Sequence, residues 1–174
     1  MSADGLKRVF FALWPDDRAR SMLAAAALRC AERSAGRGVR EANLHVTLAF
    51  IGEAGGPQVE ALRRIGAAIG FSPFRLRFDR IQYRRRQAMV WIGCASTPAA
   101  LEGLVSELRD GLARSGFPVE ARPFVPHVTA VRRARRAPRV QVEPIDAAID
   151  GFCLMRSHME DAGIRYERID GWPP

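Results

Sequence analysis

The stretch Asn43–Gly52, NLHVTLAFIG, is matched further along the chain by Phe124–Arg133, FVPHVTAVRR. Each stretch contains His-Val-Thr followed by apolar residues, a pattern typical of a strand. Side chains alternate between the two faces of a strand, so the His and the Thr of each copy point the same way. If the two strands meet, two imidazoles and two hydroxyls share one site. Such a set of groups is suited to acid–base chemistry on a phosphate.

The spacing of the two copies favours a shared site. His45 and His127 are two of only three histidines, and their separation equals that between Thr47 and Thr129, as in a duplicated half-domain. A single histidine on a strand is usually structural, and Thr is common in any strand. Two histidines in matched frames are better explained as a pair, because a neutral and a protonated imidazole together supply a general base and a general acid.

Strand and helix patterns alternate around these motifs. The clearest helix begins at Pro98, where five apolar residues between Leu101 and Leu112 lie on one face. No linker rich in Gly, Ser or Pro separates the two halves, so we expect two similar αβ lobes packed as one body. We expect strands at 7–14, 44–51 (closed by Gly52), 74–78, 89–94, 127–132, 148–157 and 164–169, and helices at 15–32, 59–69 and 98–116.

Composition indicates a globular protein with an anionic partner. The chain has 174 residues, 48% of them hydrophobic, and a formal charge of +8, enough for one domain with a core. Lys7 is the only lysine, and the planar fork of arginine suits phosphate, although codon bias also favours arginine. Cys30, Cys94 and Cys153 are odd in number and widely spaced, which suits a reducing compartment. No apolar run approaches the roughly 18 residues of a membrane span, so we expect a cytoplasmic protein.

Several other chemistries find no support in the sequence. No Asp, Glu, Cys or further His flanks either motif, so we expect no metal site. The glycine-rich loops that bind nucleotide phosphates and the GxSxG nucleophile turn are also absent, so we expect no cofactor. The third histidine, His158, lies in RSHMEDAG and is expected at the surface.

Arginines form two basic clusters. The run from Arg132 to Arg136 is typical of a solvated loop, but Arg132 differs from the others because it follows Thr129 by three residues. It is expected at the end of the motif strand, close to any phosphate that the histidines address. Residues Arg84–Arg86 could extend such a surface.

These stretches resemble the two-histidine (2H) phosphoesterases, and within them the bacterial and archaeal RNA 2′,3′-cyclic phosphodiesterases, also called 2′-5′ RNA ligase-like proteins. NLHVTLAFIGE is similar to the first HxTx motif of that family, and RPFVPHVTAVRRAR to the second, including the Arg three residues after the Thr. RVFFALWPDD resembles the opening strand and helix start, and FCLMRSHMEDAGIRYERIDGWP the closing strand pair. The resemblance therefore covers nearly the whole chain.

The resemblance implies a fold and an activity. The fold is α+β and bilobal, a single domain over residues 1–174 with two pseudo-symmetric αβ lobes and mainly antiparallel sheets around a central cleft. The activity is metal-independent hydrolysis of a 2′,3′-cyclic phosphate on RNA to a 2′-phosphate. His45 would protonate the departing 3′ oxygen and His127 would activate water, or the reverse, while Thr47, Thr129 and Arg132 hold the phosphate. A 5′-hydroxyl in place of water would give 2′-5′ ligation.

Two other functions remain open at this point. The same site could act on a small cyclic phosphodiester such as ADP-ribose cyclic phosphate. Alternatively, the chain could be a basic RNA-binding protein whose HxT strands are structural, which predicts salt-sensitive binding without turnover. For the leading hypothesis we expect a monomer that acts on RNA or a nucleotide with a cyclic end and has no membrane partner.

Overall fold

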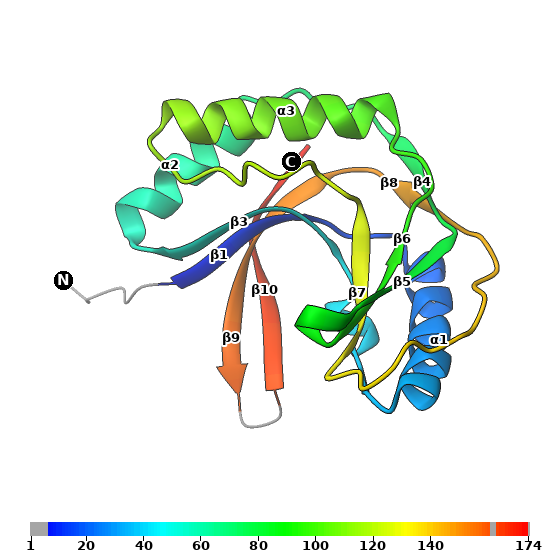
Figure 1. The fold of residues 1–174 in the computed structure, drawn as a ribbon. Coiled ribbons are helices and arrows are strands. Elements are labelled where there is room, and N and C mark those ends of the chain that lie inside the picture. Colours follow the sequence, from blue (N-terminus) through cyan, green and yellow to red (C-terminus); the bar gives the residue numbers. More distant parts are fainter. Residues whose placement is uncertain (1–6, 161–162, 174) are drawn as a thin grey trace.

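An antiparallel sheet runs through the centre of the molecule and carries the two motif strands side by side (Figure 1). The computed structural model describes residues 7–160 and 163–173. The strands are β1 (Lys7–Leu13), β2 (Arg37–Gly38), β3 (Val46–Ala54), β4 (Phe74–Phe78), β5 (Arg80–Arg84), β6 (Met89–Gly93), β7 (His127–Arg132), β8 (Ile145–Ile149), β9 (Phe152–Glu160) and β10 (Gly163–Trp172).

The order of the strands places both motifs at the middle of the sheet. It runs β10-β9-β1-β3-β7-β6-β5, with β2 paired to β7, while β4 and β8 form a separate two-stranded sheet. Every pairing is antiparallel. The expected α+β class with mainly antiparallel sheets is therefore confirmed.

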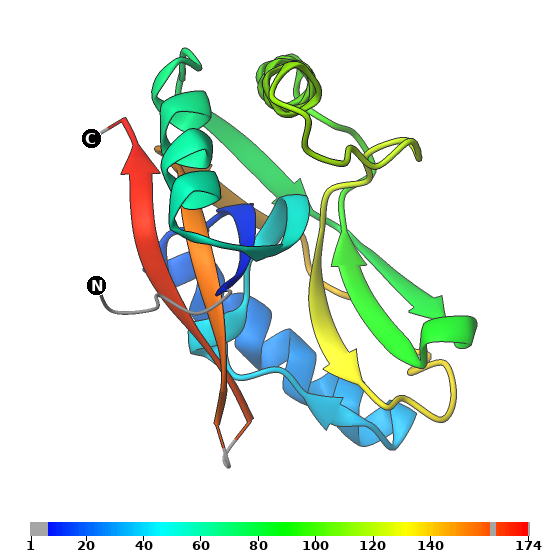
Figure 2. The same ribbon diagram turned by 90° about the vertical axis from the view of Figure 1, so that its left-hand side faces the viewer.

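The two halves of the sheet meet at the middle residue of each motif. Val46 of β3 lies opposite Val128 of β7, and this is their one ladder pair within the described residues. From this contact the group β10-β9-β1-β3 and the group β7-β6-β5 spread apart (Figure 2). Both valines are fully buried. Because side chains alternate along a strand, the His and Thr of each motif point away from this buried face.

Three helices connect the two halves: α1 (Asp17–Ser34), α2 (Gly56–Ala67) and α3 (Ala99–Arg114). Helix α1 follows β1 in the chain but packs against β7 of the other half. Helix α3 follows β6 but packs against α2 and β3 (Figure 1). One hydrophobic cluster accordingly contains buried residues from both halves of the sheet.

The start of α1 follows from its sequence. The Asp16 carboxylate accepts hydrogen bonds from the backbone N–H of Ala19, at 2.9 Å, and of Ala148 in β8, at 2.8 Å. The first bond caps the helix, and the second ties it to the C-terminal part of the chain. These bonds lower the pKa of Asp16. The predicted helix start at residues 15–17 is confirmed.

Two strand predictions were wrong in their boundaries, and another strand was missed. The first motif strand does not end at Gly52, because the glycine adopts φ 90° at an irregularity in the β1–β3 pairing and the strand continues to Ala54. The strand expected at 148–157 is two strands separated at Gly151. Strand β5 was not predicted, because its residues show no alternation of buried and exposed positions.

Residues 161–162 of the closing strand pair, between β9 and β10, lie outside the described residues. Among the described helices, none is long and apolar enough to cross a membrane.

Candidate active site

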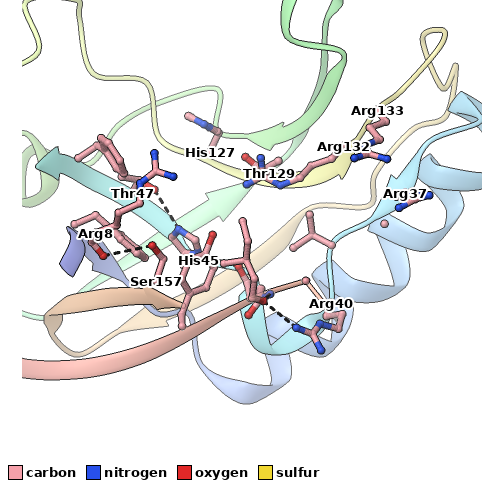
Figure 3. Close-up of a pocket in the computed structure, with 18 residues that line it drawn as sticks. Arg8, Arg37, Arg40, His45, Thr47, His127, Thr129, Arg132, Arg133 and Ser157 are labelled. Atoms are coloured by element: carbon pink, nitrogen blue, oxygen red, sulfur yellow. Dashed lines mark hydrogen bonds between the residues drawn. The ribbon is translucent and has the colours of Figure 1, made fainter. Parts of the chain in front are cut away.

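The two motifs line one open cleft of about 650 Å³ in the middle of the sheet (Figure 3). Its walls include all five residues predicted for the site, namely His45, Thr47, His127, Thr129 and Arg132. Residues from distant parts of the chain meet here because β3 and β7 are neighbours. The expectation that the two HxT strands share a site therefore holds in the geometry, and the roles of these residues stay a prediction.

Both imidazoles are oriented in the same way. Nδ1 of His45 lies 2.8 Å from the carbonyl oxygen of Asn43, and Nδ1 of His127 lies 2.7 Å from that of Val125. In each case the carbonyl belongs to the residue two positions earlier, and a carbonyl can only accept, so Nδ1 carries the proton. The tautomer is thereby fixed, and Nε2 of each ring is the atom available for proton exchange.

The hydroxyl group of the first motif lies beside the available nitrogen atom of its histidine. Oγ1 of Thr47 is 3.1 Å from Nε2 of His45 and can donate to it when the ring is neutral. Thr129 lies on the same face of β7 as His127, because the two residues are two positions apart on the strand.

Aromatic rings that the sequence did not reveal hold both histidines. His45 stacks on Trp14, with ring centroids 5.1 Å apart and planes 7° apart, and Tyr166 packs edge-on at 4.9 Å. His127 stacks on Trp91 at 3.6 Å and 16°. Two of the three tryptophans of the chain therefore position the two histidines. The only feature of the sequence that pointed to these tryptophans was their position in apolar stretches: Trp14 ends one predicted strand and Trp91 lies within another.

Burial keeps His45 neutral in the free protein. Burial is the largest cause that lowers its pKa, the Asn43 carbonyl opposes it, and the positive charges of Arg132 and protonated His127 add to the lowering, so that the pKa of His45 is about 4. At neutral pH the ring is therefore unprotonated until an anion enters the cleft. A bound phosphate would favour the protonated form and raise this pKa.

The pKa of His127 is also lowered, and one of its causes is a residue outside the cleft. Burial is the largest cause, the Val125 carbonyl opposes it, and the charge of Arg84 lowers the pKa further. The Arg84 guanidinium lies over the Trp91 ring, with its carbon 4.5 Å from the centroid. Arg84 was expected to extend a phosphate-binding surface, but it contacts the ring that stacks on His127.

Removing the charge of Arg84 is expected to raise the pKa of His127. In Arg84→Gln one of the causes that lower this pKa is lost, whereas Arg84 is not among the causes of the shift at His45. An NMR titration of the two imidazoles should therefore show His127 moving to higher pH while His45 stays near its wild-type value. Arg86→Gln, which removes the same charge from an exposed neighbour, should move neither. An unchanged His127 titration in Arg84→Gln would contradict this coupling.

The walls of the cleft are strongly basic. Among its lining residues within the described part of the chain there is no Asp or Glu. Of the arginines that line the cleft, only Arg132 was predicted from the sequence, and Arg133 was expected in a solvated loop. The arginines that line the cleft are Arg8, Arg37, Arg40, Arg132 and Arg133.

His158 lies outside this cleft. Its Nε2 is within hydrogen-bonding distance of the carboxylate of Glu167 on the neighbouring strand β10. The residue lies near the end of β9, and its side chain is half-buried. Within residues 7–160 and 163–173, no three His, Cys, Asp or Glu side chains gather as metal ligands would.

Comparison with known proteins identifies the family. A sequence profile described as the 2′-5′ RNA ligase superfamily matches residues 14–161, most of the chain. The chain belongs to the 2′-5′ RNA ligase superfamily. The match includes both HxT motifs and the strand β9, so the resemblance proposed from these motifs is confirmed.

Curated members of the superfamily are similar along most of their length. A protein of Escherichia coli K12 named RNA 2′,3′-cyclic phosphodiesterase is 34% identical over 140 residues, covering 79% of this chain and 80% of the relative. A Thermus thermophilus protein of the same name is 27% identical over 174 residues, covering 94% and 88%. The crystal structure of E. coli LigT complexed with 3′-AMP superposes with a TM-score of 0.86 at 32% identity, covering 96% and 97% of the two chains. This agreement confirms the bilobal superfamily fold.

Proposed function

We propose that the protein is an RNA 2′,3′-cyclic phosphodiesterase, which hydrolyses cyclic phosphate ends to 2′-phosphates with His45 and His127 as an acid–base pair. The observation that carries the proposal is the matched pair of imidazoles in one basic cleft, each with Nδ1 on a backbone carbonyl. The names of the relatives support the same substrate class. The complex of E. coli LigT with 3′-AMP shows that a superfamily member binds a nucleotide.

The proposed reaction is one displacement at phosphorus. One imidazole takes a proton from water through Nε2 while the water oxygen forms a bond to phosphorus. The bond from phosphorus to the 3′ oxygen breaks, and the other imidazole, protonated at Nε2, gives its proton to that oxygen. The products are a 2′-phosphomonoester and a 3′-hydroxyl, and the two rings have exchanged protonation states.

The remaining site residues would stabilise the phosphate. The resemblance to the family implies that His45 is the acid and His127 the base. The two motifs are nearly symmetric, so the reverse assignment fits the geometry equally well. The hydroxyls of Thr47 and Thr129 can donate to the non-bridging oxygens, and Arg132 offers a planar pair of N–H donors. The same displacement, with a 5′-hydroxyl taking the place of water, would form a 2′-5′ linkage. We infer further that the enzyme is a cytoplasmic monomer with one domain over residues 1–174.

Turnover of a defined substrate in the presence of EDTA tests this function. Purified protein should convert cytidine 2′,3′-cyclic phosphate to cytidine 2′-phosphate, identified by ³¹P NMR, at a rate that EDTA does not change. Formation of the 3′-phosphate, or loss of activity on chelation, would overturn the mechanism. Salt-sensitive RNA binding without turnover would instead support a non-catalytic RNA-binding protein.

A further inference from the structure

Two arginines of the cleft lie directly opposite each other. Arg37 of β2 pairs with Arg132 at the end of β7. Side chains of opposite residues in an antiparallel pair lie on the same face, with Cβ atoms about 4.5–5.5 Å apart, and like charges in such positions are destabilising. Arg133 follows immediately and lines the same end of the cleft (Figure 3). We call Arg37, Arg132 and Arg133 the β2–β7 arginine cluster.

No described carboxylate compensates this charge. The cleft lining contains no Asp or Glu within the described residues. The ion pairs formed elsewhere in the described part of the chain include none of the three arginines. All three side chains are exposed to solvent. Arginines at neighbouring positions with no carboxylate among them are suited to anions with several oxygen atoms.

The backbone is built to keep Arg37 beside Arg132. On one side of their pair the N–H of Val39 donates to the carbonyl of Ala130 at 2.8 Å, and on the other the N–H of Arg135 donates to Ser34 at 2.9 Å. Gly36 makes this approach possible, because a Cβ there would lie only 2.4 Å from Cγ1 of Val131. The short strand β2 is therefore fixed against β7, and the cluster is a defined site.

We propose that Arg37 and Arg133 of the β2–β7 arginine cluster bind a second phosphate of the same substrate, the phosphodiester on the 5′ oxygen of the nucleotide that carries the cyclic end, while Arg132 faces the cyclic phosphate. This inference rests on the proposed function. A cyclic phosphate carries one negative charge, and Arg132, three residues beyond Thr129, already faces it. Arg37 and Arg133 remain for the neighbouring phosphate.

Three substrates separate the contribution of the second phosphate: cytidine 2′,3′-cyclic phosphate, its 5′-phosphorylated form, and a dinucleotide with the same cyclic end. For the wild-type protein kcat/KM should rise about tenfold when the second phosphate is present, in either form, as one charge-assisted hydrogen bond would give. Arg37→Gln and Arg133→Gln should each remove most of this gain. The dependence of kcat/KM on salt for the dinucleotide should become weaker in each variant, because one charge attracting the second phosphate is lost.

A matched control and a stability measurement accompany these variants. Arg135→Gln removes the same charge from the same run but lies outside the cleft, so the gain should persist. At low salt the melting temperature of Arg37→Gln should equal or exceed that of the wild type, because the substitution separates two like charges. A lowered melting temperature with a proportionate loss on all three substrates would mean that Arg37 supports the fold instead, and would overturn the proposal.

The remaining outcomes are distinct. If the wild type hydrolyses all three substrates equally well, the second phosphate has no site and the inference fails while the proposed function stands. If only the dinucleotide gains, the cleft recognises the upstream nucleoside and not the phosphate, which also overturns the inference. If none of the three substrates is turned over, the proposed function itself fails.

Discussion

Replacing His45 or His127 with alanine is expected to lower kcat on cytidine 2′,3′-cyclic phosphate by about 10²–10⁴-fold, the usual contribution of a general acid or base. Each variant removes one of the two Nε2 atoms that face a common cleft. The backbone carbonyl that accepted the hydrogen bond from Nδ1 lies on an exposed or half-buried segment, so water can replace the imidazole as its partner and the fold should be retained. Initial rates at saturating substrate measure the effect directly.

The control for this prediction is the third histidine. His158→Ala makes the same substitution at a position outside the cleft, where the ring contacts Glu167, and should leave kcat within a factor of a few. Residues that act as a unit are not additive, so the His45/His127 double variant should be little worse than either single variant. Full activity in His45→Ala would rule out the paired role.

Replacing Arg132 with glutamine is expected to lower kcat by roughly 10²–10³-fold, the size found when one donor to a developing negative charge is removed. The phosphoryl oxygens gain charge as water attacks, and Arg132 lies at the end of the strand that carries His127 and Thr129. Arg132→Lys keeps the charge but loses the planar pair of donors, so it should recover only part of the rate. Rates at saturating substrate provide the measurement.

The effect of Arg132→Gln on kcat separates two roles. A loss confined to KM would mean that Arg132 binds the substrate and the transition state equally well, which contradicts its proposed part in the chemical step. Arg135→Gln, an exposed arginine three residues further along the chain and outside the cleft, is the matched control and should change neither constant.

The parts of the fold that could be predicted from sequence are those with a strong local period. Helix α3 has five buried leucine and valine positions on one face, and it was predicted within two residues at each end. Strand β5 has a mixed surface with no buried residue, and β2 has only two residues, so neither produces a periodic signal. These strands exist because neighbouring strands supply their hydrogen-bond partners, which no local pattern reveals.

The same distinction applies to the site. The HxT residues could be predicted because the His and the Thr of each motif are two positions apart, and residues at that spacing on a strand point to the same face. Trp91 stacks on His127 through the β6–β7 pairing, and Arg37 joins Arg132 through the β2–β7 pairing. Such neighbours depend on sheet register between segments far apart in the chain. Arg133 was expected in a solvated loop for the same reason, because a run of basic residues does not show which of its members face a cleft.

The dependence of kcat/KM on pH in the two histidine variants tests the central claim most directly. The wild type should show a bell-shaped profile that reports both imidazoles of the free enzyme. In the variant that lacks the acid, only the base must be deprotonated, so activity should rise with pH to a plateau. In the variant that lacks the base, only the acid must be protonated, so activity should fall from a plateau as the pH rises. With His45 as the acid, His45→Ala keeps the rising limb and His127→Ala the falling limb. If either variant retains the full bell, or if both retain the same limb, the two histidines do not form an acid–base pair.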